Sequence, residues 1–166
     1  QAGPAPTLAP KAAPAPSPCG CPGAAARTFG PRAAPAAHPG ASGGGVSELT
    51  QWPVQIHLVS PPMPALQGAD LLVAADCAPV AYPNFHSDFR KGRAVMIGCP
   101  KLDDTDAYLQ KFTELFKSTD VKSVTVLRME VPCCGGLPHV VREALATAGK
   151  DIPYKEVTVG VDGGIR

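Results

Sequence analysis

The stretch SVTVLRMEVPCCGGLPHVVREAL, residues 123–145, decides the fold. Its first part is a run of β-branched and apolar residues that stops at Pro132, which has no backbone N–H to donate, and this predicts a strand. Its second part has apolar residues at helical spacing, preceded by two glycines and followed by Gly149, and this predicts a helix. Cys133 and Cys134 therefore lie at a turn from strand to helix.

A thiol at such a turn has a special electrostatic environment. The first turn of a helix presents unpaired N–H groups and the positive end of the helix dipole, and both lower the pKa of a nearby thiol. The thiolate is the form that binds metals and attacks electrophiles. We therefore look for function at Cys133 and Cys134. His139, in the first turn of the same helix, is an additional candidate ligand, although a capping or solvent-facing role is the more usual one.

Strands and helices alternate along the rest of the chain. The further expected strands cover residues 54–59, 71–75, 93–98 and 154–161. The further expected helices are a short one after Pro83 and a longer one over 104–118, whose apolar stripe belongs to the core. This order predicts an α/β fold in three layers, with a mostly parallel sheet of about five strands and helices on both faces.

Residues 1–49 have a different composition from the rest. They are dominated by alanine, proline and glycine and contain few large apolar residues, which predicts a disordered linker before an α/β domain at 50–166. The linker carries the motif CGCPG with Cys19 and Cys21. This pair can give two thiolates to one metal, but a flexible and exposed pair without a fixed role is as consistent with the surrounding residues.

Composition argues against several functional classes. The net charge is +1, the pI is near 7.8 and no basic run occurs, so nucleic acid is not an expected partner. No apolar segment approaches the length of a membrane span, and no secretion signal is visible. The chain begins at Gln1, which suggests a processed or truncated product. No phosphate-binding loop or hydrolase motif is present.

Four cysteines follow predicted strands: Cys77, Cys99, Cys133 and Cys134. Parallel strands present their carboxyl ends at one edge of the sheet, where such folds bind ligands, so we expect the four sulfurs to meet there. Four thiolates suit an iron–sulfur cluster or, as runner-up, a structural zinc, although zinc sites usually have close C-x2-C pairs. The other readings are four small buried side chains in a non-catalytic docking domain, or a redox thiol pair formed by the two adjacent cysteines.

Several strings are similar to one known family. They are CGCPGAAARTFG (19–30), LTQWPVQIHLV (49–59), GADLLVAADCAPVAY (68–82), FHSDFRKGRAVMIGCPKLDD (85–104) and TVLRMEVPCCGGL (125–137). Together they resemble the C-terminal region of 4Fe–4S ferredoxin-type iron–sulfur proteins of anaerobic bacteria and archaea. The resemblance implies a cytoplasmic protein of low-potential electron transfer that carries an iron–sulfur cluster, most simply [4Fe-4S].

The family pattern is incomplete in this chain. Members usually begin with a ferredoxin module containing a C-x2-C-x2-C-x3-C-P run, which does not occur here, so the resemblance implies either a missing module or a separate redox partner. Cys99 with Cys133-Cys134-Gly135 is also similar to the first half of the CCG motif of heterodisulfide-reductase-type proteins. The second half is absent, and Cys77 would have to take its place.

The sequence thus leads to one principal hypothesis. It is an iron–sulfur electron-transfer protein or subunit whose cluster is held by Cys77, Cys99, Cys133 and Cys134, with Cys19, Cys21 and His139 as additional candidates. The alternatives are a thiol-based redox enzyme and a docking domain. The placing of the cysteines fits a reducing compartment, which favours the cytoplasm, and self-association into a homo-oligomer stays open.

Overall fold

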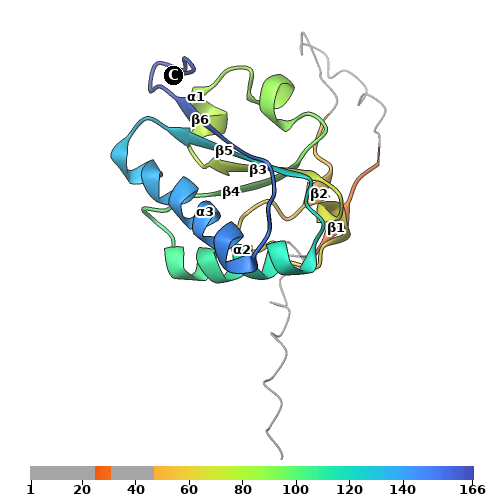
Figure 1. The fold of residues 1–166 in the computed structure, drawn as a ribbon. Helices are drawn as coiled ribbons and strands as arrows, with labels where there is room; N and C mark the ends of the chain where they lie inside the picture. The colour runs from red at the N-terminus through yellow and green to blue at the C-terminus, as the bar shows by residue number, and fades with distance from the viewer. Residues whose placement is uncertain (1–24, 31–46) are drawn as a thin grey trace, which may run out of the picture.

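The computed structural model describes residues 25–30 and 47–166, so most of the predicted linker, with Cys19 and Cys21, lies outside the described residues. Its centre is a parallel sheet of four strands (Figure 1). The strands are β3 (Asp70–Ala75), β4 (Ala94–Gly98), β5 (Ser123–Met129) and β6 (Tyr154–Val159), in the spatial order β4-β3-β5-β6. The predicted α/β fold with a parallel sheet is confirmed, with four strands in this sheet of the described residues where about five were expected.

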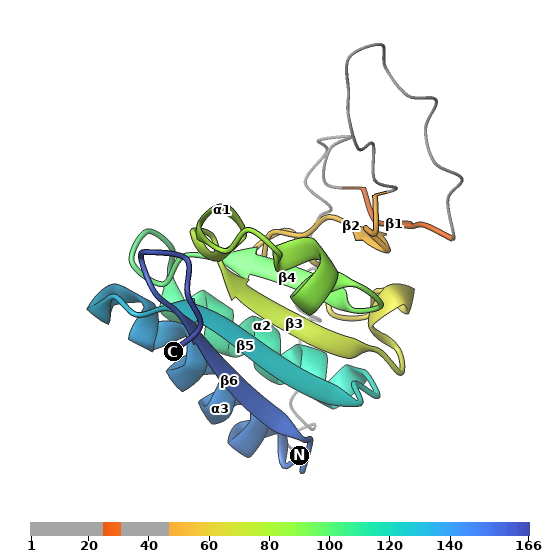
Figure 2. The same ribbon diagram turned by 90° about the horizontal axis from the view of Figure 1, so that it is seen from above.

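Helices cover both faces of this sheet. The helices α2 (Thr105–Ser118) and α3 (Gly136–Ala148) pack side by side on one face (Figures 1 and 2). The short α1 (Ala78–Ala81) and a π-helical turn over Phe85–Arg90 lie on the other face (Figure 2). The three predicted layers are therefore present.

Sequence-encoded caps mark the start of α2 and the end of α3. The Asp104 carboxylate caps α2, since it accepts hydrogen bonds from the backbone N–H groups of Asp106 at 2.9 Å and Ala107 at 3.3 Å. Gly149 ends α3 in the left-handed conformation, with φ of 65°, a conformation that suits glycine because it has no Cβ. A 3-10 turn over Pro132–Gly135 leads directly into α3.

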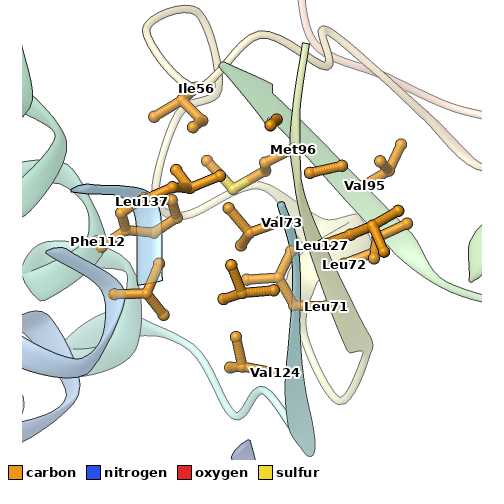
Figure 3. Packing of buried hydrophobic residues seen from close by; sticks show 14 of the residues in the cluster. Ile56, Leu71, Leu72, Val73, Val95, Met96, Phe112, Val124, Leu127 and Leu137 are labelled. Carbon is orange, nitrogen blue, oxygen red and sulfur yellow. The ribbon is translucent and has the colours of Figure 1, made fainter. Parts of the chain in front are cut away.

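The core lies between the sheet and its helices (Figure 3). Side chains alternate along the strands, so that Val73 and Met96 point toward Phe112 of α2 and Leu137 of α3, while Leu72 points to the opposite face. All five are fully buried. The continuous apolar runs of β3 and β5 are explained by this burial on both faces.

The predicted strand over 54–59 is wrong in extent. Gln55 forms a single parallel bridge to Ile97 of β4, and the chain then turns, with the N–H groups of Leu58 and Val59 donating to the Gln55 carbonyl at 2.9 and 3.0 Å. The turn and the prolines at 61–62 end the extended stretch after one bridge.

A separate two-stranded ribbon precedes this bridge. In it, β1 (Arg27–Thr28) pairs antiparallel with β2 (Gln51–Trp52). Residues 25–30, which belong to the segment predicted as linker, therefore contact the residues that begin the folded domain. A further 3-10 turn covers Pro64–Leu66. Among the described residues, no helix has the length and apolar character needed to cross a membrane.

The strand order creates a particular position at the carboxyl edge of the sheet. From β3 the chain moves outward to β4, then returns past β3 to β5 and continues to β6. The direction of winding therefore reverses between β3 and β5. In open α/β sheets, ligands bind outside the carboxyl ends of the strands at the point where the winding reverses.

Candidate thiol site at the strand ends

The cysteines of the folded domain follow three neighbouring strands. Cys77 comes after β3, Cys99 directly after β4, and the pair at 133–134 after β5. Because β3 lies between β4 and β5, the three turns that carry the cysteines are neighbours at the carboxyl edge. Cys77 and the pair after β5 flank the point where the winding reverses.

Cys134 is the buried member of this group, with 4% of its surface exposed. Burial raises the pKa of its thiol, a hydrogen bond with the backbone of Met129 opposes the rise, and the Cys133 and Cys77 thiols add to it. The pKa of Cys134 is thus raised, opposite to the direction expected from the helix N-terminus, and burial is the largest cause. Cys77 on the turn after β3 is thus among the groups that influence the Cys134 thiol after β5.

The other thiols are more accessible. Cys77 and Cys133 are exposed and Cys99 is half-buried, and none of the four forms a disulfide. The Cys77 carbonyl accepts hydrogen bonds from the N–H groups of Val80 at 3.2 Å and Ala81 at 2.9 Å, which fixes the start of α1. The group thus combines one buried sulfur with others that solvent or a partner molecule can reach.

A direct contact joins the turn of Cys99 to the turn of Cys134. Pro100 lies against Gly136 so closely that a β-carbon added to the glycine would be 3.1 Å from the proline Cβ. Gly136 is the first residue of α3, two positions after Cys134. Glycine at this position therefore lets two cysteine-bearing turns that are far apart in the sequence pack together.

A cluster of polar side chains lies beside Cys99, and the sequence pattern does not predict it. The Asp103 carboxylate accepts hydrogen bonds from the Cys99 backbone N–H at 3.2 Å and from the Tyr108 hydroxyl, and its other oxygen is 4.0 Å from His57 Nε2. The Tyr108 hydroxyl, with smaller contributions from the Cys99 N–H and from His57, holds the pKa of Asp103 below its usual value. In the sequence, His57 falls within a predicted strand and Asp103 just before a predicted helix, and only the tertiary structure brings them together.

Asp76, next to Cys77, belongs to the same region. Burial raises the pKa of its carboxyl group, and the charge of Asp103 raises it further, while a hydrogen bond to Gln55 opposes the rise. One of its oxygens, Oδ1, is buried and accepts no hydrogen bond from the described residues. Two carboxylates with opposite pKa shifts therefore lie near the thiols, and such pairs are common at functional sites.

The C-terminal turn, residues 160–166, lies against the helix that follows Cys77. A β-carbon on Gly163 would be 2.7 Å from the Ala81 carbonyl oxygen. Arg166 holds the turn by donating to Glu130 Oε2 at 3.2 Å and to Asp162 Oδ1 at 2.8 Å. The turn after β6 therefore reaches across to the element that follows β3.

The remaining candidates lie elsewhere. His139 is on the exposed surface of α3, where its Nε2 is 3.4 Å from the Glu143 carboxylate one helical turn later. Cys19 and Cys21 are outside the described residues. Within residues 25–30 and 47–166, no three histidine, cysteine or acidic side chains are gathered so that they could hold a metal ion as they stand. The strand order thus brings the thiols to one edge without forming a finished metal site.

Comparison with known proteins shows which family the chain is similar to. The Rossmann-like domain family matches residues 63–166. An "Uncharacterized protein" of Archaeoglobus fulgidus is 36% identical over 120 residues, which cover 72% of this chain and 84% of the relative. No solved structure gives a significant match.

Proposed function

This chain belongs to the Rossmann-like domain family, and from the position of its cysteines in that fold we propose that it binds an iron–sulfur cluster and transfers electrons. The observation that carries the proposal is the strand order. It places four cysteines after three neighbouring strands at the carboxyl edge of the sheet. Two of these strands, β3 and β5, flank the point where the winding reverses, and the cysteines are Cys77, Cys99, Cys133 and Cys134. The resemblance to ferredoxin-type iron–sulfur proteins supports the same function.

The donor atoms fit a soft metal centre. Thiolates are the ligands of iron–sulfur clusters, and a rigid scaffold can bring them from distant parts of a chain. When bound, such a cluster supplies reversible one-electron transfer. Cys134 would provide a buried sulfur, while Cys77 and Cys133 would close the site from the solvent side. A bound metal displaces the thiol proton, which overcomes the raised pKa of Cys134.

The raised pKa of Cys134 argues against the thiol-redox alternative for this residue. Enzymes of that kind attack with a thiolate that is present at neutral pH, and a buried thiol with a raised pKa stays protonated there. An exposed Cys133 alone would then have to be the nucleophile. A metal ion displaces the thiol proton as it binds, so the raised pKa weighs less against a metal site, which we place first, with a structural zinc as the second candidate metal.

An electron-transfer protein needs a surface for its redox partner. Large apolar side chains are exposed around the thiols, with Val80 88%, Leu102 83% and Val161 69% exposed. These three follow β3, β4 and β6, so they lie at the same carboxyl edge of the sheet as the cysteine-bearing turns. Exposed apolar groups that gather on one side of a protein are common at protein interfaces. They support docking of a redox protein or a ferredoxin module at this edge, as expected for a cytoplasmic electron carrier.

The test is metal and sulfide analysis of the full chain, purified without oxygen and reconstituted with ferrous iron and sulfide. We expect a brown protein with about four iron and four sulfide per chain, as for a [4Fe-4S] cluster. The variants Cys77→Ser, Cys99→Ser and Cys134→Ser should each lose iron. The Cys19→Ser/Cys21→Ser double variant tests whether the N-terminal pair contributes. Stoichiometric zinc without colour would favour the second candidate, and a chain that retains neither metal would refute the proposal.

A further inference from the structure

Both backbone polar groups of Cys99 are hydrogen-bonded within its turn. The Cys99 carbonyl accepts hydrogen bonds from the N–H groups of Leu102 at 3.2 Å and Asp103 at 2.9 Å. The Cys99 N–H donates to Asp103 Oδ2 at 3.2 Å. Asp103 therefore binds the backbone of Cys99 through both its own backbone N–H and its side-chain carboxylate. The thiol is the one polar group of Cys99 that takes no part in these bonds.

The carboxylate of Asp103 is itself held by a buried tyrosine. Tyr108, which is fully buried in α2, donates its hydroxyl hydrogen to the same Oδ2 that binds the Cys99 N–H. The hydroxyl reaches this oxygen over Gly98, the last residue of β4. A β-carbon on Gly98 would lie 2.8 Å from Tyr108 Cζ and 2.7 Å from Ile56 Cδ1. Glycine at the end of the strand thus makes the space through which Tyr108 reaches Asp103.

The other oxygen of Asp103 faces His57, whose ring centroid is 4.9 Å from that of Tyr108. The turn that contains His57 is held in turn by Lys111, whose Nζ donates to the carbonyl oxygens of His57 at 2.5 Å and Val59 at 2.9 Å. Oδ2 of the carboxylate is therefore held by hydrogen bonds from the Tyr108 hydroxyl and the Cys99 N–H, while Oδ1 lies 4.0 Å from the His57 ring.

We infer that Asp103, held by Tyr108, is a positioning residue that fixes the backbone of Cys99 and so presents its thiol for metal binding. This inference rests on the proposed function, because it treats Cys99 as a ligand of the same centre. A ligand whose backbone is already fixed loses less conformational entropy when it binds. Outer groups of this kind typically change metal affinity 10- to 100-fold when they are removed (an order-of-magnitude range).

A purely structural role for these hydrogen bonds would have a different signature. In that case the variants Asp103→Ala and Tyr108→Phe lower the melting temperature, but they leave Cys99 no more mobile than the other cysteines. The chain offers a matched control, because Tyr82 donates its hydroxyl hydrogen to Asp88 Oδ2 at 2.6 Å in a second tyrosine–aspartate pair. Tyr82→Phe removes the same kind of hydrogen bond outside the turn of Cys99.

The experiment has a metal-free arm and a metal-bound arm, both on the full chain. In the reduced metal-free protein, hydrogen exchange at the Cys99 amide and the rate of iodoacetamide labelling of each cysteine are measured. We expect Asp103→Ala and Tyr108→Phe to speed hydrogen exchange at the Cys99 amide roughly tenfold, because they lower the free energy of local opening at this turn. The amides of the core strands should remain protected from exchange. The rate of iodoacetamide labelling of Cys99 should differ from that in the wild type, whereas the labelling rate of Cys133 should not. In Tyr82→Phe, both the exchange rate at Cys99 and the labelling rates should match the wild type.

In the metal-bound arm, zinc and iron affinities are measured by competition with a chelator. We expect Asp103→Ala to weaken binding about 10- to 100-fold, Tyr108→Phe to weaken it less, and Asp103→Asn, which keeps an acceptor oxygen, to restore part of the affinity. If the wild type binds no metal, the proposed function fails, and the metal-free arm still decides whether Asp103 fixes Cys99. Variants with Cys99 exchange, labelling and metal affinity all equal to those of Tyr82→Phe would overturn the inference.

Discussion

Pro100 packs directly against Gly136, so closely that a β-carbon on the glycine would lie 3.1 Å from the proline Cβ. The proline follows Cys99 at the end of β4, and the glycine begins α3 two residues after Cys134. This contact joins two turns that are separated in the sequence by the whole of α2 and β5. The positions of the strand-end thiols relative to one another therefore depend on it.

The first prediction concerns this contact. Gly136→Val should push the Cys99 turn away from the Cys134 turn and destabilise the protein by about 1–3 kcal/mol, the usual cost of overpacking. Thermal unfolding and metal affinity measure the two effects. Gly135→Ala is the control, since a β-carbon there meets no atom within 4 Å. Equal metal affinity in the Gly136→Val variant and the wild type would show that the contact does not set the site.

The second prediction concerns the space under Tyr108. Gly98→Ala places a methyl group where the Tyr108 hydroxyl lies, so the ring must move and its hydrogen bond to Asp103 must break. We expect a loss of roughly 1–3 kcal/mol in the free energy of unfolding. Urea unfolding followed by circular dichroism measures it. Gly30→Ala has open space around it and should unfold like the wild type.

The third prediction concerns the core beneath the site. Phe112 is fully buried and stacks on Phe116, with ring centroids 6.0 Å apart. Phe112→Ala should cost about 3–5 kcal/mol because it removes a large apolar side chain and leaves a cavity. Glu114→Ala, on the exposed side of the same helix, should change stability by less than about 0.5 kcal/mol. Chemical denaturation of both variants decides the comparison, and similar losses would contradict this assignment of the helix faces.

The fourth prediction concerns pH and the C-terminal turn. The Arg166 guanidinium, together with the Gly164 N–H, holds the pKa of Asp162 below its ordinary value of 3.8. A lowered pKa in the folded state means that the interaction stabilises the turn above pH 3.8 and is lost as the pH falls through the folded pKa. An NMR titration of Arg166→Ala should show the pKa of Asp162 rising toward 3.8. The pKa of Asp88, which Tyr82 lowers, should stay where it is and serves as the internal reference.

Much of the fold can be read from local sequence signals. The buried strand β3 and the capped helix α2 lie within one residue of their predicted bounds, because unbroken apolar runs and an Asp104 cap are strong signals. The stretch at 54–59 has the same apolar character but forms one bridge and a turn, since it lies at the edge of the sheet and is bounded by prolines. Apolar composition alone does not distinguish these cases.

The site was predictable only in part. That cysteines follow the strands is visible in the sequence, but the strand order that makes Cys77 a neighbour of Cys134 depends on the direction in which each connection winds. The ring of Tyr108 was correctly assigned to the core, whereas its hydroxyl bond to Asp103 depends on tertiary packing. The expected low pKa of the thiols at the turn failed for Cys134, because the depth of burial cannot be read from a local pattern.

The most direct test of the central claim is electron paramagnetic resonance of the full chain, isolated without oxygen and reduced with dithionite. We predict a signal typical of a reduced iron–sulfur cluster, in an amount that matches the protein, which disappears in Cys134→Ser and persists in Gly135→Ala. A colourless and iron-free wild-type protein with no such signal, obtained under the same anaerobic conditions, would contradict it.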